Sequence, residues 1–451
     1  MAEQIASTKQ LEQKLGFWDL QGSAIGQIIG AGIMSLMPAA IAQTGRSVVF
    51  SFLIAAVITC CQAIPIIFLC SCVRLRGGTY TQMGLMAGKT FAGMATITSM
   101  MQFSLAMYGL SLAAYVRPLF GWPESSEKWI GLAVLTIFFV LNLMGIDAFA
   151  KIQNALVVIL IGSLIMFGVM GITKVHWDTY FSNEDGYFMM QGVMGMCQAA
   201  GLLTFATGGA TVVVNFSAEA KNPVRDIPLV VITSTLFVAV MYAILAFVAA
   251  GILPVPEIGN SLVKVADHIL PTPLYYVFII GGAGCALAST LNNQLATSTK
   301  PVMAVCDDGW LPRSYAALNK NKVPYKILTT FYVIGAVLCL SGLSVSVLGN
   351  LSLIVGGVTG AIIAVRTAFI PKILPEQWAK SKFKVSQPVL TLLAGIALAG
   401  SLFSTYMNAS SLFSDMPLLI ANIAFIVAGL AFGYFRGKSP NVTMTVSYDD
   451  A

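Results

Sequence analysis

Long stretches without a charged residue dominate this chain and limit what it can fold into. Charged residues make up only 10% of the 451 residues, whereas 57% are hydrophobic. A soluble domain carries about 25% charged residues, and a disordered chain needs still more charge and few apolar residues. The composition therefore excludes both classes and predicts a protein embedded in a membrane.

The chain contains eleven runs without a charged residue. Most of them have the length of one membrane crossing, which needs roughly 20 apolar residues. They are 20–45, 47–73, 90–116, 129–146, 152–173, 186–218, 227–256, 269–299, 327–365, 385–414 and 416–435. The 39-residue run 327–365 contains the helix-breaking stretches Ser341–Ser344 and Gly349-Asn350, so we split it in two. The sequence thus predicts twelve transmembrane helices and an all-α integral membrane fold.

The distribution of Lys and Arg predicts the orientation. If the amino terminus lies inside and the spans alternate, 20 of these 25 residues fall inside and 5 outside. Cytoplasmic loops carry an excess of Lys and Arg. We therefore expect a multi-pass protein of the cell (plasma, or bacterial inner) membrane with both termini in the cytoplasm. The net charge of +6 then reflects topology, and we expect no nucleic-acid partner.

Two spans contain weak helix formers at their centres. Span 1 includes Gly26, Gly30 and Gly32, and span 6 reads Phe205-Ala206-Thr207-Gly208-Gly209-Ala210. Glycine in a helix interior costs about 1 kcal/mol relative to alanine. Such glycines often only allow close helix packing. However, interrupted spans at matching positions of two halves are typical of a transporter binding site.

A free amino acid fits two such breaks chemically. Half-helix amino termini attract a carboxylate, and freed carbonyls accept hydrogen bonds from an ammonium group. The predicted substrate-binding residues are Ile28, Ile29, Gly30, Ala31, Gly32, Phe205, Ala206, Thr207, Gly208 and Gly209.

Four motifs in order resemble the amino acid–polyamine–organocation (APC) superfamily of secondary transporters, including its bacterial L-type-like permeases. They are G-x-I-I-G-A-G-I at 26–33, G-G-T-Y at 77–80, E-A-K-N-P-V-R-D-I-P at 219–228 and D-G-W-L-P at 308–312. The resemblance implies the leucine-transporter fold, a 5+5 inverted repeat with two accessory helices. It also implies that Phe205 closes over the substrate. Where many relatives carry an aromatic, a polar residue and a Trp, this chain has Thr207, Gly208 and Ala210, which affects substrate identity.

This fold implies a division of the chain into five parts. They are a cytoplasmic segment (1–16), a first repeat with spans 1–5 and an external loop (17–185), a second repeat with spans 6–10 (186–370), accessory spans 11 and 12 (371–435) and a cytoplasmic tail (436–451).

Lys151, near the start of span 5, is a candidate coupling residue. In sodium-independent relatives a span 5 lysine occupies the sodium position, so the resemblance implies contacts with carbonyls near Gly26 and Ile29. A desolvated lysine could also exchange a proton, whereas the alternative is a snorkelling, topology-setting lysine. Asn292 and Asn293 in span 8 either line the path or form interhelical hydrogen bonds.

The expected function is transport of free, neutral α-amino acids by alternating access, as sodium-independent exchange or uniport. Proton symport and antiport of an amine or polyamine against an amino acid remain alternatives. We expect no enzyme activity, no metal and no cofactor, because no His, Asp, Glu or Cys cluster lies at membrane depth. A channel would need a continuous polar pore, which the scattered polar residues do not suggest. No cysteine lies in an external loop, so an accessory subunit is not expected.

Overall fold

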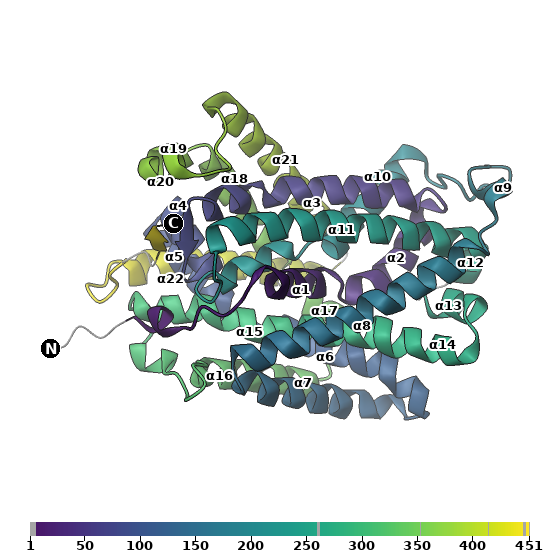
Figure 1. Cartoon of the computed structure of the whole chain (residues 1–451), viewed down its shortest axis with the longest axis horizontal. Helices are drawn as coiled ribbons and strands as arrows, with labels where there is room; N and C mark the ends of the chain where they lie inside the picture. Colours follow the sequence, from purple (N-terminus) through teal and green to yellow (C-terminus); the bar gives the residue numbers. More distant parts are fainter. Residues whose placement is uncertain (1–5, 259–261, 352, 414, 445–447, 451) are drawn as a thin grey trace.

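The computed structural model describes all residues except 1–5, 259–261, 352, 414, 445–447 and 451. Its long helices run along the long axis of the molecule, and the two termini lie at the same end, which we call the terminal end (Figure 1). The opposite end is called the distal end.

Ten helical segments of the described chain are long and apolar enough to cross a membrane. They are built on α3 (Val48–Cys70), α5 with α6 (Lys89–Met100, Phe103–Val116), α7 (Glu127–Leu143), α8 (Ile146–Ile172), α10 (Gly192–Thr207), α11 (Pro223–Ile252), α14 with α15 (Thr272–Val277, Cys285–Asp307), α18 (Leu353–Thr367), α21 (Gln387–Ser411) and α22 (Met416–Gly437).

Span 1 is an eleventh candidate, made of α1 (Phe17–Ile28) and α2 (Ala31–Thr44). The run 327–365 is split as expected, because α16 (Tyr325–Leu340) ends before Gly342, whose φ is +79°. However, α16 has only 16 residues, fewer than the roughly 20 of a full crossing. The structure therefore gives ten or eleven candidate spans, and the count of twelve stays a prediction.

Short elements connect these spans. The short α-helices are α4 (Gly78–Ala87), α9 (Trp177–Tyr180), α12 (Val255–Ile258), α13 (Val263–Ile269), α17 (Val345–Asn350), α19 (Ile370–Ile373) and α20 (Pro375–Lys380). Five 3₁₀ segments (Ser7–Gln10, Arg117–Phe120, Glu124–Ser126, Ala210–Phe216, Arg313–Ala316) and one π-helical segment (Phe278–Gly284) complete the helical part. Strands β1 (Val73–Leu75) and β2 (Tyr448–Asp450) pair antiparallel.

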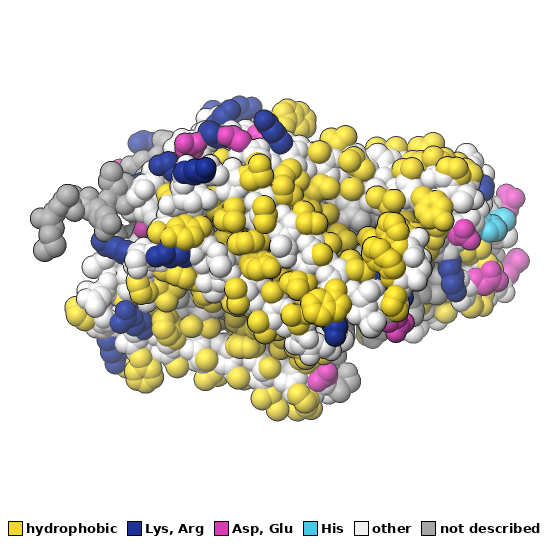
Figure 2. Space-filling model, turned by 90° about the horizontal axis from the view of Figure 1, so that it is seen from below, with side chains coloured by type: hydrophobic (Ala, Val, Ile, Leu, Met, Phe, Trp, Pro, Cys, Tyr) yellow, Lys and Arg dark blue, Asp and Glu magenta, His cyan; other side chains and the backbone are white. Residues whose placement is uncertain are grey.

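The surface has the polarity of a membrane protein. Hydrophobic side chains cover the middle of the molecule, whereas Lys and Arg gather toward the terminal end (Figure 2). The aliphatic side chains of Val57, Val158, Val169, Val240 and Leu392, all in spans, are 60–70% exposed. An apolar surface of this extent is stable in contact with lipid rather than with water.

The distal end is closed by a charged contact. Arg46, which follows α2, is 8% exposed and binds Asp185 through two N–O distances of 2.6 and 2.8 Å. Its guanidinium also donates to the carbonyls of Tyr180 and Ser182. The guanidinium holds the pKa of Asp185 at about 2. Span 1 is thereby fastened to the loop before α10.

At the terminal end, the chain before α1 is fastened to the loops between spans. Leu15 forms a parallel bridge with Ala220: the Leu15 amide donates to the Glu219 carbonyl at 3.0 Å, and the Lys221 amide donates to the Leu15 carbonyl at 2.9 Å. The backbone amides of Ser7 and Thr8 donate to the carboxylate of Asp307, at the end of α15. This segment is therefore an ordered part of the fold.

Candidate functional site

Span 1 is interrupted where its glycines predict. The helix α1 ends at Ile28, Ile29 and Gly30 leave helical geometry, and α2 begins at Ala31. A bend of 53° follows farther along the span, between the segments Phe17–Met34 and Leu36–Thr44. The first N–H groups of a helix have no partner within it. The start of α2 therefore presents amide donors in the middle of the span.

Side chains of neighbouring helices satisfy the carbonyls that this break frees. The Thr290 and Ser289 hydroxyls of α15 donate to the Gly26 carbonyl, at 2.8 and 3.3 Å. The Tyr242 hydroxyl of α11 lies 3.4 Å from the Ile28 carbonyl. The break is thus stabilised from two sides by neutral hydroxyl groups.

Span 6 is interrupted at its glycine pair. The helix α10 ends at Thr207, Gly208 is extended, and Gly209 has a φ of +117°. The chain then continues as a 3₁₀ helix from Ala210. The last carbonyls of α10 lack partners within their own helix, because the chain leaves α geometry there. Residues other than glycine rarely adopt the backbone conformation of Gly209.

The two breaks lie against each other. A Cβ added to Gly32 would lie 2.9 Å from the Cα of Ala206, and one added to Gly209 would lie 3.2 Å from the Gln27 carbonyl oxygen. The glycines therefore serve both explanations given by the sequence: they interrupt the helices and they allow close packing.

A cavity of about 410 Å³ opens beside these breaks, here called the central cavity. Six predicted residues line it: Ile28, Gly30, Gly32, Phe205, Gly208 and Gly209. Phe205 is 47% exposed. Ile29, Ala206 and Thr207 are buried beside the cavity and do not line it. The backbone of Ala31 starts α2, and its side chain lies outside the described parts.

Several lining residues of the central cavity lie outside the two breaks and are not among the predicted ones. Gln27, Gln62, Ser104, Tyr108 and Thr204 contribute polar groups. Further lining groups come from α18 and α21, namely Gly356, Gly357, Gly360, Ser401, Ser404 and Asn408. In α21 the spacing 401, 404, 408 places polar residues on one helix face, which the sequence could have signalled.

A second cavity of about 260 Å³ lies next to the central cavity. The two share the lining residues Gln62, Gly208, Gly209, Gly356 and Gly360. The second cavity continues to Thr79 and Gln82 of α4, which lies at the terminal end in Figure 1. Gly208 and Gly209, at the span 6 break, thus border both cavities.

The contacts expected for Lys151 stay a prediction, because the described structure does not show them. Its side chain is exposed, and no hydrogen bond links it to the described residues around span 1. Gln153 lies at that position instead: it is 0% exposed, and its Nε2 would collide with a Cβ added to Gly26. Residues two apart on a helix do not share a face, so placing Gln153 inward turns Lys151 outward. The predicted coupling role of Lys151 has no support from its position.

Asn292 and Asn293 connect helices. The Asn292 amide donates to Gln153 Oε1 at 2.9 Å and accepts from Asn142 at 3.0 Å. Asn293 donates to Gln27 Oε1 at 2.8 Å. Both asparagines are fully buried, and neither lines the central cavity. This geometry agrees with the interhelical alternative rather than with path lining.

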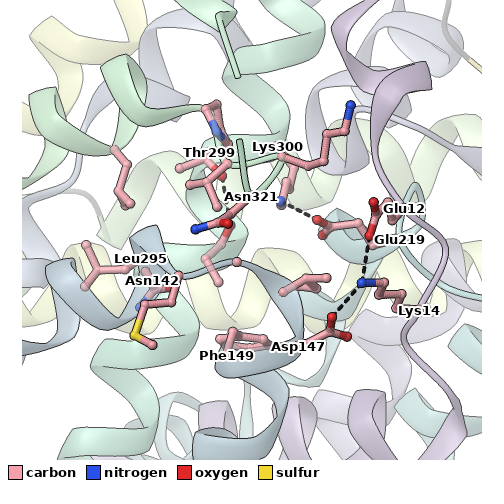
Figure 3. A pocket seen from close by; sticks show the side chains of 18 of the residues that line it. Glu12, Lys14, Asn142, Asp147, Phe149, Glu219, Leu295, Thr299, Lys300 and Asn321 are labelled. Atoms are coloured by element: carbon pink, nitrogen blue, oxygen red, sulfur yellow. Dashed lines mark hydrogen bonds and ion pairs between the residues drawn. The ribbon is translucent and has the colours of Figure 1, made fainter. Parts of the chain in front are cut away.

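A third cavity of about 210 Å³, here called the charged cavity, lies at the terminal end between α8, α15 and the start of α16 (Figure 3). In it Lys300 Nζ lies 2.8 Å from Glu219 Oε1, and the two side chains are 6% and 4% exposed. Lys14 is paired with Glu12 and Asp147. The motif 219–228 is therefore anchored to α15 by a buried ion pair.

Among the residues that the structure describes, no group of three or more His, Cys, Asp or Glu side chains is placed to hold a metal ion. The groups in the central cavity that can bind a polar ligand are hydroxyls, amides, the glycine backbone and the ends of the interrupted helices.

Comparison with known proteins gives a family match over nearly the whole chain. The amino acid permease family model matches residues 15–445. A branched-chain amino acid permease of Bacillus subtilis is 25% identical over 88% of this chain and 88% of its own. The vacuolar cationic amino acid transporter 4 of Arabidopsis thaliana is 25% identical over 73% of this chain and 58% of its own. An uncharacterized transporter of Mycobacterium tuberculosis is 26% identical over 73% of both chains.

Proposed function

The chain belongs to the amino acid permease family of the APC superfamily, and we propose that it carries free, neutral α-amino acids across a cell membrane by alternating access. The observation that carries this proposal is the meeting of two interrupted helices at one cavity. Two of the relatives named above carry the names of a branched-chain amino acid permease and a cationic amino acid transporter, and these names do not define the substrate here.

The two helix ends can hold the two charged groups of an amino acid. In this proposal the carboxylate binds the free N–H groups at the start of α2, near Gly30 and Gly32, where the helix dipole favours an anion. The ammonium donates to carbonyls at the end of α10, near Phe205. Phe205 then covers the bound molecule.

The composition of the central cavity favours an uncharged side chain. No Asp, Glu, Lys or Arg occurs among its lining residues, all of which are described. A cationic substrate side chain would lose its hydration there without gaining a carboxylate partner, which is costly. The amides and hydroxyls beside Met107 and Leu348 can accommodate neutral polar or medium-sized apolar side chains.

Sodium-independent exchange or uniport is the proposed mode. Carbonyls at a helix break can coordinate sodium, but the Gly26 carbonyl already accepts two hydroxyl hydrogen bonds. We further propose the 5+5 inverted repeat, with residues 17–185 and 186–370 as its halves. Proton symport is the alternative within this class; among the lining residues of the central cavity, Tyr108 is the one with a titratable side chain.

The orientation is proposed from charge. Lys and Arg gather at the terminal end, so this end should face the cytoplasm of a plasma membrane (Figure 2). No accessory subunit is required by this proposal.

Proteoliposome uptake of a panel of labelled amino acids tests the function. Uptake should be fastest for neutral amino acids, should rise with internal amino acid, and should not depend on sodium. An amine that lacks only the carboxylate should not compete. Competition by that amine at equal concentration would favour amine or polyamine antiport, and acceleration by an inward proton gradient would favour symport.

A pair of substitutions tests whether uptake depends on the contact between the two breaks: Gly32→Ala is the test variant and Gly162→Ala is its control. The first adds a methyl group 2.9 Å from the Ala206 backbone, whereas nothing lies within 4 Å at Gly162. Only Gly32→Ala should reduce uptake at equal membrane abundance. Equal uptake by both variants would contradict a substrate site at the contact between the two breaks.

A further inference from the structure

A basic pocket of about 370 Å³ lies at the terminal end, away from the central cavity. Three segments form it: the chain after α3 (71–74), the start of α11 (221–225) and α20 with the residues that follow it (377–383). None of its lining residues lines the central cavity or the charged cavity, so the proposed transport site does not explain it.

Unpaired cationic side chains line this basic pocket from two of its three segments. Lys221, Arg225, Lys380 and Lys382 are exposed, and none has a carboxylate within 4 Å among the described residues. Arg74, from the third segment, also lines the pocket and stands opposite Asp449 in the β1–β2 ladder.

Topology alone does not produce this imbalance. The charged cavity lies at the same end and also gathers lysines, but it includes Glu12, Asp147 and Glu219 (Figure 3). The basic pocket has no Asp or Glu among its lining residues, all of which are described. Four cations that repel one another around one cavity are stabilised by an anion that binds between them.

A helix amino terminus adds to the positive character of the basic pocket. The 30-residue helix α11 begins at Pro223, so its positive dipole end faces the same space. The buried Ser71 and Ser381 hydroxyls bind each other at 2.8 Å, and Ser71 also donates to the Phe68 carbonyl, so they form the floor rather than ligand contacts. Ammonium and guanidinium groups and a helix amino terminus together suit the oxygens of a phosphate group.

The position of the pocket indicates where such a phosphate comes from. The helices α19 and α20 lie beside the end of the bundle rather than within it (Figure 1). Trp378 of α20 contacts Phe68 at the end of α3, with ring centroids 5.8 Å apart, and Phe383 lines the pocket as an apolar group. This combination of basic and aromatic residues is typical of the level of lipid headgroups.

We propose that the basic pocket binds the phosphate headgroup of an anionic phospholipid from the leaflet at the terminal end. Because the bound headgroup contacts the loops after α3, before α11 and before α21, it holds these three loops together. The choice of the cytoplasmic leaflet rests on the orientation proposed above; the binding site itself does not.

Lipid binding to the purified full chain tests the proposal. The probe is short-chain phosphatidylglycerol, measured by native mass spectrometry and by the thermal unfolding midpoint in neutral detergent. The test variant is Lys380→Gln/Lys382→Gln. The control, Lys320→Gln/Lys322→Gln, removes the same charge from the charged cavity. Wild type and control should bind and be stabilised, whereas the test variant should bind at least about tenfold more weakly, the loss expected for about 1.4 kcal/mol.

Two further arms identify the source of the phosphate. Phosphatidylcholine of the same chain length should not protect the protein, and glycerol 3-phosphate should not displace the lipid at equal concentration. Displacement by glycerol 3-phosphate would overturn the lipid assignment in favour of a soluble phosphate compound. Equal binding by the test variant, or equal protection by phosphatidylcholine, would overturn the anion site. Unchanged uptake of the test variant in neutral lipid verifies its fold.

Discussion

Gln153→Ala, compared with Lys151→Ala, is the sharpest test of how span 1 is held in its interrupted form. The two residues lie two positions apart on α8, but one is fully buried and the other exposed. Gln153 accepts from Asn292 at 2.9 Å and lies 3.4 Å from the Gly22 carbonyl. Removing it leaves a buried amide of Asn292 without this partner.

The magnitude follows from those contacts. A buried polar group that loses its partner costs about 1–3 kcal/mol, and about 1.4 kcal/mol corresponds to a factor of ten. We therefore expect Gln153→Ala to lower the unfolding midpoint and to reduce uptake by on the order of tenfold. Lys151→Ala should change uptake by no more than about twofold, because surface substitutions rarely exceed about 0.5 kcal/mol.

The assay is initial uptake into proteoliposomes at matched protein content, with the unfolding midpoint measured on the same preparations. Gln153→Glu provides a second comparison, since it keeps the acceptor for Asn292 and removes the donor to Gly22. If Lys151→Ala stops uptake while Gln153→Ala transports normally, the contacts described here do not support the break, and a lysine-based coupling step returns.

Three more substitutions test other parts of the structure. Lys300→Met leaves the carboxylate of Glu219 buried without its cation and should lower the free energy of unfolding by about 3–5 kcal/mol. The double variant Lys300→Met/Glu219→Gln should regain most of the lost stability, which denaturation in detergent measures. Gly209→Ala places a side chain at a φ of +117° and 3.2 Å from the Gln27 carbonyl oxygen, which should strain the break by about 1–3 kcal/mol. The KM for uptake should therefore rise, and an unchanged KM would contradict a substrate site at the span 6 break. Asp185→Asn should destabilise the protein by the same amount from pH 5 to 8, because Arg46 lowers the pKa of Asp185 to about 2 and the carboxylate stays ionised there. The stabilisation is lost only as the pH falls from about 4 toward 2, so a midpoint difference that shrinks between pH 7 and 5 would refute this reading.

The sequence predicted the breaks well because glycine acts locally. Gly208 and Gly209 end α10 through backbone geometry alone, and no distant contact is needed to anticipate it. The length of each apolar run similarly limits where a span can lie, although α16 is shorter than a full crossing. These features depend on residues near one another in the chain.

The side-chain surroundings of the breaks could not be predicted in the same way. Whether Lys151 or Gln153 faces span 1 depends on the rotation of α8 about its axis, which the packing of several helices determines. An apolar span that is covered by lipid on one side and protein on the other gives little indication of that rotation. The stripe Ser401, Ser404 and Asn408 in α21 shows that a polar face can carry this information when it exists.

The backbone bridge between Leu15 and Ala220 joins the stretch leading into α1 to the stretch following the 3₁₀ segment of span 6. The terminal-end halves of the two interrupted helices are therefore linked through their backbones, and they should move together as one rigid body. A covalent link between these two halves would leave the cycle intact, whereas a link from either half to α8 would stop it.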